Sequence, residues 1–352
     1  MTDATRNLLL YALIGLIGLL APYLAPAFRV QMALLWMMIL FALTWDLGGG
    51  QMGYNSFGNI VFFGIGCYVA AVVQRDLFFA VGGQPQATGD LATTSPLFNY
   101  FNGFAVGLAL AVIIALAVAA ALGSGILGLR GHYFAICTLG VGVAAGEIAS
   151  GWDYIGAGSG MVAPIFPGGP GQNAIFFYYF FFALAAICFF TLKWLYGTRF
   201  GLAINAIRDD EDKAEAMGIH TTRYKTVAWC VAAFFLALAG GAFGHLNNFI
   251  DREVAFPGIT FGVWMVLMAI LGGQGTLWGP VIGATIFHAT QELFWTYFIG
   301  WQRVALGLLI VVIVVFFPLG IMGWLRSRWP ERFGETVDLE ARTAPISLRE
   351  TR

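Results

Sequence analysis

The stretch GLAINAIRDDEDKAEAMGIHTTRYK, residues 201–225, is a charged island in an otherwise apolar chain. Of the 37 formally charged side chains in 352 residues, eleven lie between Lys193 and Lys225. Charge that is distributed so unevenly indicates where the chain meets water and where it contacts a partner.

The composition around this island is that of an integral membrane protein. Hydrophobic residues make up 59% and charged residues 11%, whereas soluble domains have about 45–50% apolar and about 25% charged residues. A net charge of −1 gives no basic field for nucleic acid, which excludes that class of partner. The cysteines stand singly in apolar stretches, which favours small buried side chains over a metal site or a disulfide framework. They are Cys67, Cys137, Cys188 and Cys230.

The apolar stretches predict an all-α, polytopic membrane helix bundle. A crossing needs about 20 mainly apolar residues, and by this measure the chain has about ten transmembrane helices, several of them short. They are expected near residues 8–28, 30–47, 58–74, 104–123, 132–150, 173–194, 226–249, 258–273, 277–299 and 303–324.

The segment GGGQMGYNSFG, residues 48–58, is too polar and glycine-rich for an ordinary lipid-facing helix. It is flanked by predicted spans, and irregular backbone at membrane depth is tolerated only inside protein or beside water. We therefore expect a broken or re-entrant segment that is packed within the protein.

The distribution of Lys and Arg predicts the orientation. With ten spans and the N-terminus inside, fourteen basic residues fall in the cytoplasmic segments and four outside. Both termini are therefore expected in the cytoplasm. The first span has an alternative interpretation as a cleaved signal peptide, because Arg6 precedes the apolar run and small residues follow at 25–27, but the run is long for a signal core.

Two outer loops are rich in turn-forming residues. Residues 76–102 are expected to be a solvated connector. Residues 151–172 contain six glycines and three prolines between 156 and 171, which is compatible either with a simple connector or with a defined surface for docking or gating. Within the spans, glycines repeat every four residues, as at Gly142 and Gly146, which predicts close helix packing.

Ionisable residues inside spans are candidates for function because they are costly in the bilayer. Asp46 lies near the inner end of the second span, Glu147 in the outer third of the fifth, and Glu292 in the outer half of the ninth. Each is either a hydrogen-bonded packing residue or a residue that lines the solute path. No acidic ladder of a proton-driven carrier and no motif of a membrane-embedded enzyme is found in the sequence.

The island itself predicts a short helix over residues 210–217. Asp209 is the expected N-cap, acidic residues follow in the first turn, and Gly218 is the expected stop. Pairs four residues apart, Asp209 with Lys213 and Arg208 with Asp212, would support it modestly. Two turns are too short to be stable alone, so the helix either docks on a partner or lies on the membrane surface. The expected contact face consists of Ile204, Ile207, Ala214 and Met217.

At these residues the chain resembles the permeases of ATP-binding-cassette transporters, particularly the branched-chain amino acid type. The motif AEAMGI, residues 214–219, preceded by AIRDDEDK, is similar to the family's cytoplasmic coupling segment. The resemblance covers most of residues 40–325. It also includes TRYK at 222–225, LAGGAFGHLNNFI at 238–250, LGGQGTLWGPVIGA at 271–284, LRGHYFAICTLGVGVAAGEI at 129–148 and GYNSFGNIVFFGIGCY at 53–68.

The resemblance implies two sets of site residues. The first set would couple the chain to an ATPase and comprises Arg208, Asp209, Asp210, Glu211, Glu215, Ala216 and Gly218. The second would line the solute path and comprises Asp46, Asn55, Ser56, Asn59, Glu147 and Glu292. The chain has Gly58-Asn59 where the family commonly has Gly-His, and Asp46 where it often has Asn, so these departures would alter the accepted solute.

The resemblance also implies partners. They are a second homologous permease that completes the pore, two cytoplasmic ATPase subunits, a periplasmic solute-binding protein and the lipid bilayer of a bacterial or archaeal inner membrane. The chain has no GxxxxGK[ST] phosphate loop, so it is expected to be a non-catalytic subunit without cofactor or metal, with ATP and Mg on the ATPases. Residues 1–325 form the expected permease domain, 195–225 its coupling loop, and 326–352 a disordered cytoplasmic tail after an interfacial anchor.

Three alternatives remain open at this point. The same machinery could import urea, amides or small organic acids rather than branched-chain or other amino acids. A secondary carrier or channel would work without nucleotide, but it leaves the capped cytoplasmic helix without a reason. A non-transporting membrane scaffold would leave the polar segment 48–58 unexplained.

Overall fold

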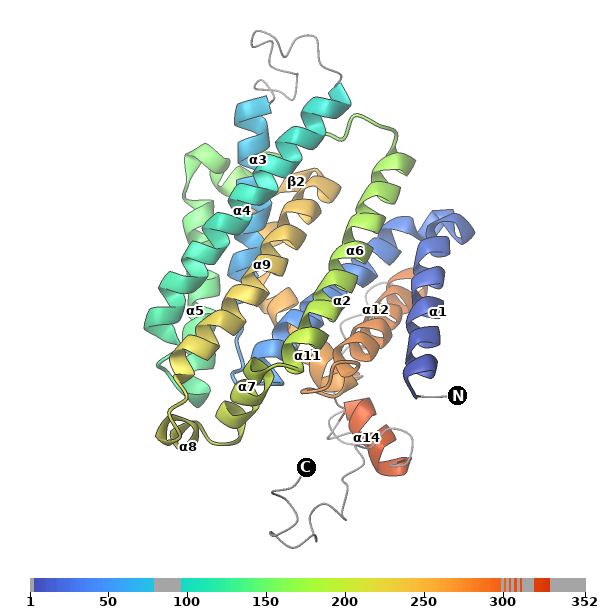
Figure 1. Cartoon of the computed structure of the whole chain (residues 1–352). Coiled ribbons are helices and arrows are strands. Elements are labelled where there is room, and N and C mark those ends of the chain that lie inside the picture. Colours follow the sequence, from blue (N-terminus) through green and yellow to red (C-terminus); the bar gives the residue numbers. More distant parts are fainter. Residues whose placement is uncertain are drawn as a thin grey trace, which may run out of the picture.

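The computed structural model shows an all-α helix bundle (Figure 1). It describes residues 3–78, 96–298 and 320–329, together with the isolated positions 301, 304, 307, 308 and 311. The prediction of an all-α, polytopic bundle is confirmed for these residues.

The first half of the chain forms long helices that run through the bundle at different inclinations (Figure 1). Their order is α1 (Asp3–Leu24), η1 (Pro26–Phe28), α2 (Arg29–Gly49), α3 (Ile60–Phe78), α4 (Pro96–Ile126), α5 (Gly131–Ser150) and α6 (Pro170–Tyr196). Between α5 and α6 lie η3 (Asp153–Ile155), η4 (Ala157–Ser159) and β1 (Met161–Val162).

The second half of the chain begins with two short helices. Its elements are α7 (Arg199–Asp209), α8 (Glu211–Ala216), α9 (Thr221–Asn247), β2 (Phe249–Ile250), α10 (Arg252–Ala255), α11 (Gly258–Gly272), α12 (Gly279–Tyr297) and α14 (Gly320–Arg328). The long helix α9 runs back through the centre of the bundle, between α3, α4, α2 and α6. We call the end of the bundle that carries α7 and α8 the α8 end, and the opposite end, which carries β2, the α10 end (Figure 1). At the α10 end, α10 packs against β2 and α5.

Within the described residues, seven helices are long and apolar enough to cross a membrane. They coincide with the second to eighth predicted spans and run over Pro26–Gly49, Ile60–Leu77, Leu97–Ile126, Gly131–Ser150, Pro170–Tyr196, Thr221–Asn247 and Arg252–Gly272. In the first predicted span the apolar helix Tyr11–Leu24 is shorter, and α12 occupies the ninth. Most of the tenth lies outside the described residues, so the total of ten stays a prediction.

Small residues bring the helices together, as the glycine spacing predicts. A Cβ atom on Gly240 of α9 would lie 1.9 Å from the carbonyl oxygen of Phe63 on α3, and one on Gly283 of α12 would lie 1.9 Å from that of Met268 on α11. Neither approach leaves room for any side chain, so glycine permits backbone contact where lipid provides no hydrophobic drive for association.

The polar segment between α2 and α3 is packed inside the protein, as expected. Met52, Tyr54 and Ser56 are buried, and the backbone carbonyl of Ser56 accepts a hydrogen bond of 2.8 Å from the indole Nε1 of Trp45. Side chains of the bundle therefore supply the partners that lipid could not.

At the α10 end, the connection between α5 and α6 has its own structure. Met161 pairs with Ile250 and Val162 with Phe249 in an antiparallel two-stranded ladder. Tyr154 stacks under the Arg75 guanidinium, 5.1 Å from the ring centroid, and its hydroxyl donates to Asp76. The connection thus has a defined structure, and its role in docking or gating stays a prediction.

The cytoplasmic tail was expected to begin at residue 326. In the structure α14 continues to Arg328, so the first residues of the expected tail are helical. Residues 330–352 lie outside the described residues, so the expected disorder concerns a part of the chain that is not described.

Candidate functional site

The charged island forms two consecutive helices, α7 and α8. Asp210 separates them with an extended backbone, φ −165° and ψ 106°, and its carboxylate accepts a hydrogen bond of 3.1 Å from the backbone N–H of Lys213. Gly218 follows with φ +86°, a conformation that ends helices and favours glycine. The predicted short helix with a glycine stop is confirmed.

Three details of the prediction are wrong. The N-cap is Asp210 and not Asp209, which is the last residue of α7, and α8 covers 211–216 rather than 210–217. The spacing of four residues therefore does not pair side chains across the break between the helices. Instead, Lys213 pairs with Asp210 at 2.8 Å, Arg208 with Asp209 at 3.2 Å, and Asp212 with Arg130 at 2.6 Å.

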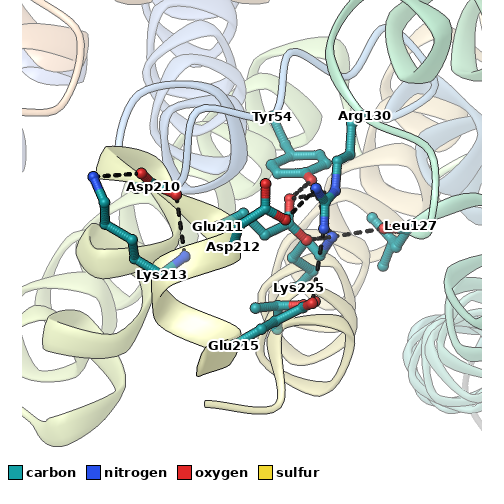
Figure 2. A network of polar contacts seen from close by, with 10 residues as sticks. Tyr54, Leu127, Arg130, Asp210, Glu211, Asp212, Lys213, Glu215 and Lys225 are labelled. Carbon is teal, nitrogen blue, oxygen red and sulfur yellow. Dashed lines mark hydrogen bonds and ion pairs between the residues drawn. The ribbon is translucent and has the colours of Figure 1, made fainter. Parts of the chain in front are cut away.

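A buried lysine at the start of α9 attaches α8 to the bundle. The side chain of Lys225 is 1% exposed, and its Nζ donates to Glu211 Oε1 at 2.6 Å, to the backbone oxygen of Leu127 at 2.7 Å and to the hydroxyl of Tyr54 at 3.0 Å (Figure 2). All three protons of the ammonium group thus have an acceptor. With Arg130, these residues form what we call the Lys225 cluster.

The second oxygen of Glu211 closes the cluster. The Tyr54 hydroxyl donates to Glu211 Oε2, and Arg130 Nε lies 3.4 Å from the same oxygen. Burial alone would raise the pKa of Glu211, but the hydrogen bonds from Lys225 and Tyr54 outweigh it and lower that pKa below its ordinary value. Burial and then the neighbouring carboxylate raise the pKa of Tyr54, so the phenol remains a donor.

Two further contacts hold the remaining turn of α8. Thr221 Oγ1, at the start of α9, donates to Glu215 Oε1 at 2.6 Å, and Arg130 Nη2 lies 3.8 Å from Glu215 Oε2. Arg130 belongs to the connection between α4 and α5. The six-residue helix, too short to be stable alone, is therefore fixed to three other parts of the chain.

A second polar contact joins α2 to the turn between α11 and α12. Asp46 Oδ1 accepts a hydrogen bond of 2.8 Å from the backbone N–H of Gly275, and Gln51 Nε2 donates to the Gly275 oxygen at 2.9 Å. The guanidinium of Arg208 lies beside this contact, because a Cβ atom on Gly275 would be 3.6 Å from Arg208 Nη1. This contact therefore joins α2 to the turn before α12 at the α8 end.

The expected apolar contact face divides into two parts. Ile204, Ile207 and Ala214 are buried inside this chain, whereas Met217 is 83% exposed. Among the expected coupling residues, Ala216 and Gly218 are exposed beside Met217, while Glu211 points inward into the Lys225 cluster. The exposed surface of α8 therefore combines a charged part, with Asp212 and Lys213, and an apolar part at its C-terminal end, with Ala216 and Met217.

The expected solute-path residues do not converge on one place. Ser56 and Asn59 line a cavity of about 10 Å³ that Tyr54, Leu127 and Lys225 of the Lys225 cluster also line. Asn59 Oδ1 accepts a hydrogen bond of 3.0 Å from the indole Nε1 of Trp229. Asn55 is exposed nearby, and Asp46 makes the Gly275 contact. Asn59 and Asp46, the departures from the family pattern, thus make contacts within the chain.

The two remaining path residues lie elsewhere. Glu147 Oε1 accepts from Arg252 Nη2 at 2.8 Å at the α10 end, and both side chains are partly exposed. Glu292 is half-buried on α12, one turn after His288, whose Nε2 lies 2.9 Å from the backbone oxygen of Gln31.

Tyr54, Arg130 and Lys225 were not predicted to act together. A signal for one of them exists in the sequence, because a lysine at the first turn of a long apolar helix needs a charged partner if it is buried. Nothing in the sequence identifies Glu211, fourteen residues earlier, as that partner, since only the fold brings the two together.

Comparisons with known proteins agree on one family. The chain is 25% identical over 345 residues to the high-affinity branched-chain amino acid transport system permease protein LivM of Salmonella typhimurium, covering 88% of this chain and 79% of that protein. It is 24% identical to LivM of Escherichia coli, covering 84% and 74%. The permease protein LivH of Salmonella typhimurium is 30% identical over 128 residues, 36% of this chain and 40% of LivH.

No solved structure matches the chain. The family model described as "Branched-chain amino acid transport system / permease component" matches residues 30–317, which include both α8 and the Lys225 cluster. The chain therefore belongs to the family of permease components of branched-chain amino acid transport systems.

Proposed function

We propose that this chain is the permease subunit of an ATP-driven importer and that α8 is its contact with the ATPase. The observation that carries the proposal is the construction of α8. A six-residue helix is capped at both ends and attached to α9 by the buried Lys225–Glu211 pair, to the segment between α2 and α3 by the Tyr54 hydroxyl, and to the connection between α4 and α5 by the partly exposed Arg130, while Met217 after its last turn projects outward.

This construction suits the transmission of a movement. A helix that merely lay on a membrane surface would need no buried ionic attachment, and Met217 would meet lipid rather than a partner. When an ATPase moves the exposed turn, the Lys225 cluster carries the displacement to α9 and to the segments that connect the other helices. The chain would then switch between outward and inward access.

The proposal includes the partners and the orientation. A second permease would complete the pore, two ATPases would bind ATP and Mg, and a periplasmic binding protein would deliver the solute, so the chain itself would need no cofactor or metal. The α8 end and both termini would face the cytoplasm of a bacterial or archaeal cell, with ten crossings of its inner membrane. The excess of basic residues on that side supports this orientation.

Branched-chain or other amino acids are the proposed cargo, and the family match to residues 30–317 supports this choice. Urea, amides or small organic acids are the alternative cargo for the same machinery. A carrier or channel independent of ATP is the alternative of another class, and nucleotide dependence of uptake separates it from the proposal.

The test is Met217→Asp in the full-length chain, expressed with its neighbouring transporter subunits. Because Met217 is 83% exposed, we expect an unchanged melting temperature, loss of the co-purifying ATPase and loss of solute-stimulated ATP hydrolysis. Leu202→Asp on α7, at a residue 72% exposed, is the matched control.

The outcomes are distinct. If Met217→Asp kept ATPase binding and uptake, the assignment of α8 would be wrong. If only Leu202→Asp released the ATPase, the contact would lie on α7. Uptake by the unaltered protein without ATP would favour a carrier or channel.

A further inference from the structure

The helix α14 and the residue after it carry two tryptophans and two arginines at the α8 end. Trp324 and Trp329 are 44% and 46% exposed, and their ring centroids lie 5.9 Å apart at an interplanar angle of 83°. Arg326 and Arg328, between them in sequence, are also exposed. Tryptophan is enriched where the hydrocarbon of a bilayer meets the headgroups, and long basic side chains near helix ends extend into that layer. The last turn of α14 therefore has the composition of a membrane surface contact.

The start of α14 fixes the depth of this turn. Gly320 has φ +69°, and a Cβ atom there would lie 2.5 Å from Gly273 Cα and 2.6 Å from the backbone oxygen of Ile270. Only glycine fits so close to the turn between α11 and α12. Gly273 directly follows the membrane span that ends at Gly272, so α14 begins where α11 leaves the apolar layer.

From this point α14 projects away from the bundle. Figure 1 shows it beyond the lower ends of α1 and α12. Arg326 and Arg328 follow Gly320 by six and eight residues, which corresponds to about 9–12 Å along a helix. Both arginines therefore lie outside the hydrocarbon core, at the level of the headgroups.

Neither arginine has a carboxylate partner within the part of the chain that the structure describes. The sequence has no Asp or Glu between Glu292 and Glu331, so the helix itself carries only positive charge. Four other arginines of the bundle do pair with a carboxylate of this chain, namely Arg75, Arg130, Arg208 and Arg252. The charge of α14 is thus available to an anion outside the chain.

We infer that the last turn of α14 binds the headgroups of anionic phospholipids at the membrane surface. Residues two apart lie on different sides of a helix, so Arg326 and Arg328 contact separate headgroups and their effects add. Each guanidinium donates hydrogen bonds to a phosphate, while Trp324 and Trp329 hold the turn at the interface. The inference goes beyond the proposed function, because it requires a membrane but no ATPase.

The arrangement favours anionic lipid over other occupants. Figure 1 shows α8 and α14 on opposite sides of the α8 end, so an ATPase seated on Met217 need not reach α14. Exposed tryptophans at the depth where a span ends suit lipid. Positive charge without a carboxylate beside it favours an anionic headgroup over a zwitterionic one, whose ammonium group would find no acceptor.

The experiment measures lipid binding to the full-length chain, purified with the subunits that accompany it. Native mass spectrometry would count the phosphatidylglycerol and phosphatidylcholine molecules retained from mixed micelles, and thermal unfolding would report the stabilisation by each lipid. We expect preferential retention of phosphatidylglycerol and a higher melting temperature in its presence. Added salt should reduce both effects, because exposed charges are screened.

The variants separate charge from packing. Arg326→Gln and Arg328→Gln should each lower the affinity for phosphatidylglycerol relative to phosphatidylcholine about fivefold, the factor that corresponds to about 1 kcal/mol per basic residue at a lipid surface. Arg326→Lys should retain the preference, because it keeps the charge. Trp324→Ala combined with Trp329→Ala should weaken the retention of both lipids equally. Arg223→Gln, at an exposed arginine of α9, is the matched control and should change nothing.

Three results would overturn the inference. The first is an unchanged lipid preference when Arg326→Gln and Arg328→Gln are combined, and the second is the same loss in Arg223→Gln. The third is release of the ATPase by the combined variant with lipid binding intact, because α14 would then be a protein contact. Equal weakening for both lipids in the arginine variants would assign these residues a structural role instead. A lost preference for phosphatidylglycerol with the ATPase still bound would support the inference.

Discussion

The two ends of the bundle each contain an ion pair between helices, and the two pairs differ in their surroundings. At the α8 end, Lys225 and Glu211 meet at 2.6 Å with side chains 1% and 11% exposed. At the α10 end, Arg252 and Glu147 meet at 2.8 Å but are 40% and 58% exposed. The geometry of the bonds is almost the same, so the difference lies in access to water.

This difference decides what each pair can do. A buried charge that loses its partner has no water to replace it, so the Lys225 cluster can only hold its elements in one arrangement. An exposed pair is screened and easily exchanged. The pair at the α8 end is therefore costly to separate, whereas the pair at the α10 end can separate at little cost.

The largest expected effect comes from removing one member of the buried pair. Glu211→Ala leaves the Lys225 ammonium buried with neutral partners only, and breaking such a pair costs about 3–5 kcal/mol. Glu147→Ala should cost under about 1 kcal/mol, because exposed pairs contribute little. Reversible unfolding of both variants in mixed micelles measures the free energies of unfolding. Equal losses would remove the distinction between the two ends.

A double variant separates charge from packing at the α8 end. In Lys225→Met combined with Glu211→Leu no charge remains buried without a partner, and apolar replacements of buried pairs are often neutral for stability. We expect most of the stability lost in Glu211→Ala to return. If the double variant were as unstable as Glu211→Ala, the loss would come from the shape of the site and not from the charge.

The fold was predictable from the sequence to the extent that it depends on local composition. Seven predicted spans coincide with helices because about 20 apolar residues in lipid have few alternatives to a helix. Gly218 ended α8 as expected, since its φ of +86° is a local property. Where two acidic residues follow each other, however, local rules did not decide between Asp209 and Asp210 as the N-cap.

The Lys225 cluster was not predictable because its members come from distant segments. Tyr54, Arg130 and Glu211 are brought to one place by the packing of α3, α4 and α9, and no periodicity in the sequence reports that packing. The same holds for Asp46, whose partner is the backbone of Gly275, 229 residues away. Single ionisable residues in spans indicated that partners must exist, but not which ones.

An intermediate loss of stability is expected when Asp46 is replaced. Asp46 makes a second polar contact at the α8 end, so its loss can be compared with the losses at the two ion pairs. Asp46→Ala would leave the Gly275 N–H without its acceptor, at a cost of about 1–3 kcal/mol. Asp46→Asn keeps an oxygen in place and should cost less than half of that. Unfolding measurements on both variants, with transport assays, provide the test. A change of cargo in Asp46→Asn without loss of stability would assign Asp46 to the solute path instead.

The smallest expected effect is the response of the buried pair to pH. The pKa of Glu211 lies below its ordinary value of 4.5, so the folded state favours the ionised form. Its contribution to stability is therefore fully present above pH 4.5 and is lost only as the pH falls through the lower pKa of the folded state. The difference in melting temperature between the unaltered protein and Glu211→Gln should stay constant from pH 8 to about 5 and narrow below about 4.5. A difference that already narrowed at pH 6 would mean that the carboxyl binds a proton in the folded state, and the Lys225 cluster would then lack the charge that distinguishes it from the pair at the α10 end.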